Sequence, residues 1–142
     1  MKKIFKVIRV VIAVILIAIG LIAIFGKEPE VDLSTIEFEQ VNIDDLYNEL
    51  NTNPAAAKEK YKDKWVEIIG RVDVIDSDLK YIGVYSTSSE FNFDNVHSTL
   101  KTDDVKEIVK TVSIGDVVTI RGKITDAGEI LGYYLDLYEI IK

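Results

Sequence analysis

Two segments of the chain decide its fold: Val66–Val72, which reads VEIIGRV, and Val118–Ile124, which reads VTIRGKI. Apolar and polar residues alternate in both segments, as they do in a strand with one buried face. Each segment also carries a glycine inside the alternating run, Gly70 in the first and Gly122 in the second. Glycine within a strand marks a bulge or a sharp bend, and the long strands of a small barrel need such corners. We therefore expect both segments to be long, bent strands of one barrel.

The order of the remaining elements is the second indication of the fold. A helical pattern over Asp103–Lys110 is acidic at its start and basic at its end, as the helix dipole prefers. This helix lies between the third and the fourth of five strand-like segments. The predicted strands are Trp65–Ile75, Tyr81–Tyr85, Asn95–Leu100, Val117–Ile124 and Ile130–Ile140. Because this is the element order of the OB-fold, a five-stranded Greek-key barrel, we predict a mainly β protein of that fold.

A helical hairpin is predicted in front of the barrel. Asn42 is a good N-cap residue for a helix whose apolar residues form one stripe. Asn53 followed by Pro54 is typical of the cap and first position of a second short helix, which continues to Tyr61. Trp65 opens the first barrel strand directly after this hairpin, and we expect its side chain to plug the end of the barrel.

The amino terminus is a segment of a different kind. Val10–Phe25 is an apolar run broken only by one glycine, and at about 1.5 Å per residue it would form a helix of roughly 24 Å. Apolar residues before the run extend it, and Lys6 and Arg9 can snorkel their charged ends into the membrane interface. We predict a transmembrane helix within residues 1–26 that contacts the membrane through residues 7–25.

A cleaved secretory signal is the competing interpretation, because it also begins with basic residues and an apolar core. The end of the run, Ile22–Gly26, has bulky residues in place of the spaced small residues of a cleavage site, which favours an uncleaved anchor. Basic residues precede the run and acidic ones follow it, so the amino terminus is expected in the cytoplasm of a single-pass cell-membrane protein. Residues 27–41 then form an acidic linker, and residues 42–142 form an extracytoplasmic OB-fold domain.

The charge of the exported part limits its ligands. All 24 acidic residues and 13 of the 17 basic ones follow residue 26, which gives this part a net charge of −11. Nucleic-acid binding draws most of its affinity from neutralising phosphates, so this charge argues against nucleic acid as a partner. The chain contains no cysteine, which excludes disulfides, thiolate chemistry and a lipidated cysteine anchor.

Several short motifs resemble those of one family. They are Asn42, Ala55–Ala57, Lys60–Lys62, Lys64–Glu67, Gly70–Val72, Gly115–Asp116 and Val118–Lys123. In this arrangement the chain, over about residues 42–140, resembles the tRNA_anti-like family of bacterial OB-fold proteins. The resemblance implies the OB-fold and an exported or lipid-anchored protein, and it implies no functional residue. A transmembrane anchor stands here in place of the lipidated cysteine.

No catalytic residue, metal site or cofactor is predicted. His97 is the only histidine, and one histidine makes neither a catalytic triad nor a metal site, so we expect a surface position on the third strand. Arg71 and Arg121 invite comparison with nucleases built on OB barrels, in which arginines position phosphate beside metal-binding carboxylates. No such carboxylate set is recognisable around them, which favours a structural role for both arginines.

Four tyrosines are the candidate ligand-binding residues. OB barrels bind ligands across their second and third strands, and alternation places Tyr81 and Tyr85 on one face of the second strand. Tyr134 and Tyr138 share a face of the last strand, whereas Tyr133 faces the core. Tyrosines among acidic residues suit a protein or a glycan better than a polyanion. We therefore predict a non-enzymatic extracytoplasmic binding module, with a single-stranded nucleic-acid-binding domain as the first alternative and a barrel-based hydrolase as the second.

Overall fold

The computed structural model describes the backbone of residues 1–25, 29–88 and 94–142, without the side chains of residue 2 and residues 18–25. The chain divides into two compact units, Met1–Asp32 and Leu33–Lys142. Each unit is described by itself below.

The first unit contains the helix α1 (Lys2–Phe25), which covers the apolar run found in the sequence. Among the residues that the structure describes, no helix is long and apolar enough to cross a membrane. Residues 18–25 of the predicted membrane span fall outside the residues with described side chains.

The second unit is a closed β-barrel. Its strands are β2 (Trp65–Ile75), β3 (Tyr81–Tyr85), β4 (Asn95–Leu100), β5 (Val117–Gly128) and β6 (Gly132–Ile141). Neighbouring strands follow the order β2-β3-β4-β6-β5, and β5 pairs back onto β2 to close the barrel. The β4–β6 pair is parallel and the other four pairs are antiparallel. The predicted OB-fold is confirmed, and the first three strands have the predicted bounds.

Gly70 and Gly122 both lie close to the backbone of a neighbouring strand. The β5–β6 register shifts between Arg121 and Gly122, so Gly122 marks the predicted bulge. A side chain at Gly122 would overlap the backbone oxygen of Asp136 and would lie 2.6 Å from Leu135. At Gly70 no bulge occurs, but an added Cβ would lie only 3.0 Å from the backbone oxygen of Tyr85. Gly122 therefore requires glycine, whereas at Gly70 an added Cβ would crowd the neighbouring backbone.

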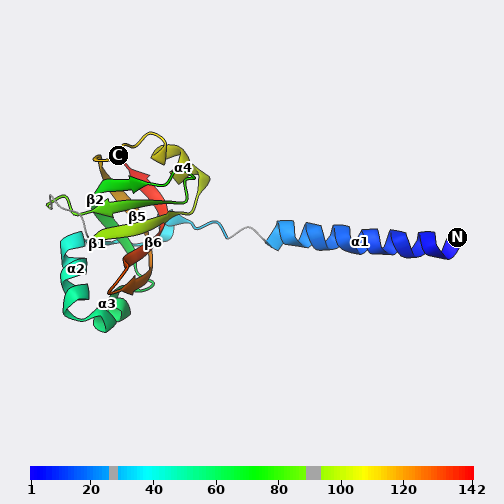
Figure 1. Ribbon diagram of the computed structural model, residues 1–142, viewed down its shortest axis with the longest axis horizontal. Coiled ribbons are helices and arrows are strands. Elements are labelled where there is room, and N and C mark those ends of the chain that lie inside the picture. Colours follow the sequence, from blue (N-terminus) through cyan, green and yellow to red (C-terminus); the bar gives the residue numbers. More distant parts are fainter. Residues whose placement is uncertain (26–28, 89–93) are drawn as a thin grey trace. The chain divides into compact units, whose positions relative to one another are not determined.

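The predicted helices form with the predicted caps. The side chain of Asn42 accepts a hydrogen bond from the backbone N–H of Asp44 at 2.7 Å and begins α2 (Ile43–Thr52). Asn53 accepts one from Ala56 at 3.1 Å and begins α3 (Pro54–Tyr61). The helix predicted between the third and fourth barrel strands is α4 (Asp103–Val109), which lies between β4 and β5. In the view of Figure 1, α2 and α3 lie on the side of the barrel away from α4.

The core joins the barrel interior to α2 and α3. Ile43, Leu46 and Leu50 of α2 are buried in one apolar cluster with the inward residues of every barrel strand. Tyr133 of β6 lies between the two helices, with its ring edge-on to Tyr47 at 5.7 Å and to Tyr61 at 5.9 Å. The Tyr133 hydroxyl donates to the backbone oxygen of Leu46 at 3.0 Å. The helical hairpin formed by α2 and α3 therefore completes the core, in place of the expected Trp65.

The expectation that Trp65 plugs the barrel is wrong. Val66 faces the interior, and since successive strand residues point to opposite faces, Trp65 lies on the outer face. There it packs edge-on against Phe38, with 6.1 Å between ring centroids. Phe38 precedes a short strand, β1 (Glu39–Val41), which pairs in parallel with β2. Part of the segment interpreted as a linker thus belongs to the second unit, which begins at Leu33.

Candidate functional site

Three rings lie in contact across the outer face of β3, β4 and β6. Tyr81 of β3 stacks on His97 of β4 with 4.3 Å between centroids and 28° between planes. His97 in turn contacts Tyr134 of β6, with 5.0 Å between centroids and 49° between planes. We call Tyr81, His97 and Tyr134 the aromatic row.

Strand alternation and register build this row. On β3 and β4 the residues next to Tyr81 and His97 face the interior, where Ile82, Val96 and Ser98 are buried, so both rings must face outward. The parallel β4–β6 pairing then places His97 directly beside Tyr134. The rings are held by three paired strands and need no loop to position them.

The row carries little charge at neutral pH. Burial lowers the pKa of the His97 imidazole below its ordinary value of 6.5, which favours the neutral ring. A set of neutral, flat rings offers stacking surface in place of ionic contacts. Sequence reasoning placed His97 on the surface of this strand but missed its neighbours. The missing information was the register between β4 and β6, which no local pattern contains.

The four predicted tyrosines separate into three locations. Tyr81 and Tyr134 belong to the aromatic row. Tyr138 instead packs against Trp65, with 5.3 Å between their centroids, on the part of the barrel surface near Phe38. Tyr85 lies at the far end of β3, where it is paired in register with Arg71 and Asn95. The structure therefore brings two of the four tyrosines together.

The turn between β5 and β6 lies beside the row. Its two apolar residues, Ile130 and Leu131, are 87% and 66% exposed. The sequence had placed Ile130 at the start of the last strand, whereas β6 begins at Gly132. A hollow of about 170 Å³, which we call the hairpin pocket, lies between this turn and Tyr134. Its lining residues are Asp126, Gly128, Glu129, Ile130, Leu131 and Tyr134.

The two arginines compared with nuclease residues are both engaged in structural contacts. Arg121 bridges two neighbouring strands, with its Nε 2.6 Å from Glu67 and its Nη1 2.8 Å from Glu139. Arg71 donates to the backbone oxygen of Gly115 at 2.7 Å. Across the part of the chain that the structure describes, no group of three or more histidine, aspartate or glutamate side chains is placed to hold a metal ion. These contacts assign both guanidinium groups to the barrel wall.

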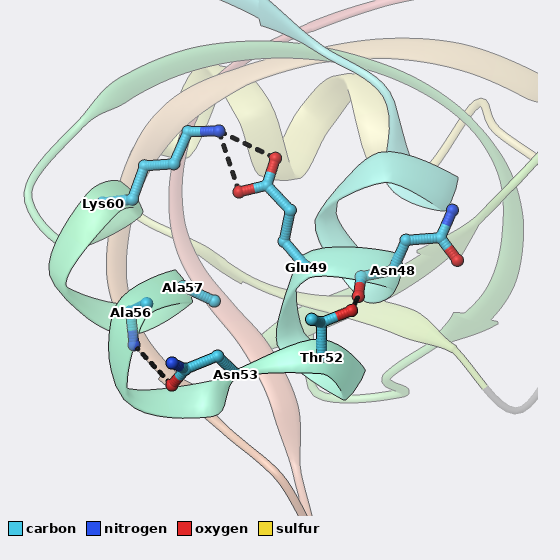
Figure 2. A pocket seen from close by; sticks show the side chains of 7 residues that line it. All are labelled: Asn48, Glu49, Thr52, Asn53, Ala56, Ala57 and Lys60. Atoms are coloured by element: carbon cyan, nitrogen blue, oxygen red, sulfur yellow. Dashed lines mark hydrogen bonds and ion pairs between the residues drawn. The ribbon is translucent and has the colours of Figure 1, made fainter.

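A second hollow, of about 350 Å³, lies between α2 and α3 (Figure 2). Figure 2 shows Lys60 of α3 reaching Glu49 of α2, and its Nζ lies 2.7 and 2.8 Å from the two carboxylate oxygens. This contact, followed by a hydrogen bond from Tyr61, lowers the pKa of Glu49. Figure 2 also draws the Asn53 cap at the start of α3 and a hydrogen bond within α2 from the Thr52 hydroxyl to the Asn48 backbone oxygen. The ion pair between Lys60 and Glu49 therefore joins the two helices of the hairpin.

Comparison with solved structures supports the fold. A lipoprotein from Klebsiella pneumoniae, named as a candidate nucleic acid-binding protein, is 18% identical with a TM-score of 0.62, covering 80% of this chain and 99% of its own. A candidate aspartyl-tRNA synthetase from Leishmania major is 16% identical with a TM-score of 0.49, covering 80% of this chain and 22% of its own. The Stn1–Ten1 complex from S. pombe is 15% identical with a TM-score of 0.45, covering 78% and 81%. The Klebsiella lipoprotein, whose TM-score exceeds 0.5, shows a similarity of fold alone at this identity.

No curated protein sequence matches the chain significantly. The family described as tRNA_anti-like does match, over residues 1–131. This match covers most of the chain, including the amino-terminal helix and the segments around Gly70 and Gly122. The chain belongs to the tRNA_anti-like family.

Proposed function

We propose that this protein is a non-enzymatic binding module whose ligand lies on the aromatic row. The observation that carries the proposal is the contact of Tyr81, His97 and Tyr134 on the outer face of β3, β4 and β6. OB barrels use the strands equivalent to β3 and β4, together with the loops beside them, to bind ligands. Both arginines that a hydrolase would use are engaged in structural contacts, which favours binding over catalysis.

A protein or a glycan suits this surface better than a polyanion. Flat tyrosine and imidazole rings stack on sugar rings and on side chains, and tyrosine also offers a hydroxyl for hydrogen bonding. Acidic residues border the row: Asp136 lies on β6 beyond Tyr134, and Glu129 lies in the adjoining turn. The net charge of −11 after residue 26 would repel a phosphate backbone.

Single-stranded nucleic acid is the second candidate, because stacked rings also bind bases. Base stacking on an aromatic side chain is worth about 1–3 kcal/mol per base and tolerates any sequence. The tRNA_anti-like description of the family and the description of the Klebsiella lipoprotein favour this candidate. Such binding would weaken steeply with salt, whereas stacking on a glycan would not.

Photo-crosslinking in cells tests the binding surface. A benzophenone amino acid is placed at Thr99 of the full chain, which is paired with Tyr81 in register. We expect an adduct that Tyr81→Ala and Tyr134→Ala each abolish and that Tyr85→Ala, on the same face of β3 but outside the row, retains. Digestion of the adduct by protease, glycosidase or nuclease identifies the ligand class. An adduct that both row variants leave intact would contradict the proposed site.

We further infer that residues 7–25 anchor the chain in the cell membrane, with the barrel outside the cytoplasm. The apolar run and the four basic residues before it support this inference. The test is protease treatment of cells with an opened outer barrier and a sealed cytoplasmic membrane. Cleavage of the barrel is expected. Protection that is lost upon lysis would place the barrel in the cytoplasm and favour nucleic acid.

A further inference from the structure

The turn between β5 and β6 is supported at its β6 end by contacts with the barrel and α2. Gly132 has a positive φ of 71°, and any side chain there would overlap the hydroxyl of Tyr47. That hydroxyl donates to the backbone oxygen of Asn95 at 2.6 Å, which joins α2 to β4 beneath the turn. Ile130 and Leu131 are thus presented to solvent by a supported turn. Two adjacent large apolar residues on such a turn suggest a contact surface.

Some of the carboxylates around this turn form ion pairs with lysines and others do not. Asp126 forms an ion pair with Lys58 at 2.7 Å, and Asp136 forms one with Lys101 at 3.8 Å. Within the described ranges, neither Glu129 nor Asp94 has a basic side chain within ion-pair distance. Glu129 lines the hairpin pocket, and both acids line a neighbouring hollow of about 260 Å³ on the α2 side of the turn. The carboxylate at the rim of the pocket is therefore available to a ligand.

The hairpin pocket combines two chemical features. Its apolar part is formed by Ile130, Leu131 and the ring of Tyr134, and its rim carries the Glu129 carboxylate. Arginine and lysine match both features, since each has an apolar stem and a cationic end. A guanidinium can also lie over a tyrosine face, where the attraction between cation and ring adds to the ion pair. An acidic or phosphorylated group would be repelled.

We propose that the ligand is a segment of a protein and that an arginine or lysine side chain of this segment lies in the hairpin pocket. This inference rests on the proposed function, because Tyr134 belongs both to the pocket and to the aromatic row. The neighbouring residues of the segment pack on His97 and Tyr81, while the basic side chain reaches Glu129. Charge complementarity selects a basic protein segment over a nucleic acid at this surface.

The test begins with a random dodecapeptide library panned on the full chain in detergent micelles. We expect the selected peptides to be enriched in arginine or lysine next to apolar residues. One selected peptide is then synthesised with arginine and with citrulline, its neutral isostere, and both affinities are measured. We expect the arginine peptide to bind about fivefold more tightly, since an exposed ion pair and a cation–π contact each contribute modestly.

Two variants test whether Glu129 causes this difference in affinity. Glu129→Gln should weaken the arginine peptide about fivefold and leave the citrulline peptide unchanged. Glu59→Gln, the same charge change on α3 outside the pocket, should alter neither. Equal weakening of both peptides by Glu129→Gln, or selected peptides without basic residues, would overturn the inference. Selected peptides that depend on Tyr81 but not on Glu129 would overturn it while leaving the proposed function standing. Selected peptides whose binding neither Tyr81→Ala nor Tyr134→Ala weakens would contradict the proposed function itself.

Discussion

Tyr81 and His97 stack with 4.3 Å between ring centroids, although 16 positions separate them in the chain. They lie on neighbouring antiparallel strands, diagonally across the β3–β4 ladder, since His97 pairs in register with Gly83. Diagonal neighbours on a sheet lie within reach of aromatic side chains. The stack therefore joins the two strands that OB barrels use for ligand binding and shields one face of the imidazole.

This shielding predicts how the His97 imidazole titrates. Burial holds the pKa of His97 below 6.5, so the neutral ring contributes stability above pH 6.5, and that stability is lost as the pH falls through the lower pKa of the folded state. Since His97 is the only histidine, its proton NMR signal can be followed without assignment of others. We expect a midpoint below 6.5 in the wild type. Tyr81→Ala should move it toward 6.5, and Tyr85→Ala should not. An unchanged midpoint in Tyr81→Ala would show that the ring does not shield His97.

The bulge at Gly122 predicts a strong asymmetry between two glycines of β5. Gly122→Ala would place a methyl group against the backbone oxygen of Asp136, which cannot rotate away, and we expect it to destabilise the domain by about 3 kcal/mol. Gly128→Ala serves as the control, because an added Cβ there meets nothing within 4 Å. We expect this control to lie within about 0.5 kcal/mol of the wild type. Urea unfolding followed by circular dichroism measures both. Equal stabilities would contradict the packing described at Gly122.

Local sequence patterns were sufficient to predict most of the barrel. Alternation identified Tyr133 as a core residue, and Asn42 and Asn53 fixed the helix starts, because caps depend on neighbours two or three positions away. The site was less predictable. His97 meets Tyr134 only through a parallel strand pair that is 37 positions apart in sequence. The short strand β1 likewise depends on its pairing with β2, in which Glu39 lies beside Val66, 27 positions away in the sequence.

The buried tyrosines predict a loss of stability at alkaline pH. Burial raises the pKa of Tyr47 from 10.0 to about 12, and it also raises the pKa values of Tyr61 and Tyr133. Because a raised folded-state pKa favours the protonated form, this stability is full below pH 10 and is lost as the pH rises toward 12. For Tyr47 alone, two pKa units correspond to about 2.7 kcal/mol at the end of that window.

Tyr47→Phe separates this titration from packing. The variant loses the hydrogen bond to Asn95, which should cost about 1 kcal/mol at pH 7. It should also lose less stability than the wild type between pH 10 and 12, because phenylalanine has no hydroxyl that could ionise in the unfolded chain. Thermal unfolding across this range provides the measurement. If the variant and the wild type lost the same stability between pH 10 and 12, Tyr47 would not contribute to the alkaline loss of stability.

The bridge at Arg121 predicts a stability effect that depends on salt. Its guanidinium lies between Glu67 and Glu139 and over the ring of Phe38, at 5.3 Å from the ring centroid. Arg121→Ala leaves two carboxylates facing a vacated position, so it should lower the urea midpoint more than Arg71→Ala, which removes one hydrogen bond to a backbone oxygen. The difference between the variants should shrink in 1 M salt, where the Debye length is about 3 Å. A difference that salt leaves unchanged would mean that packing on Phe38, rather than charge, accounts for the role of Arg121 in the barrel wall.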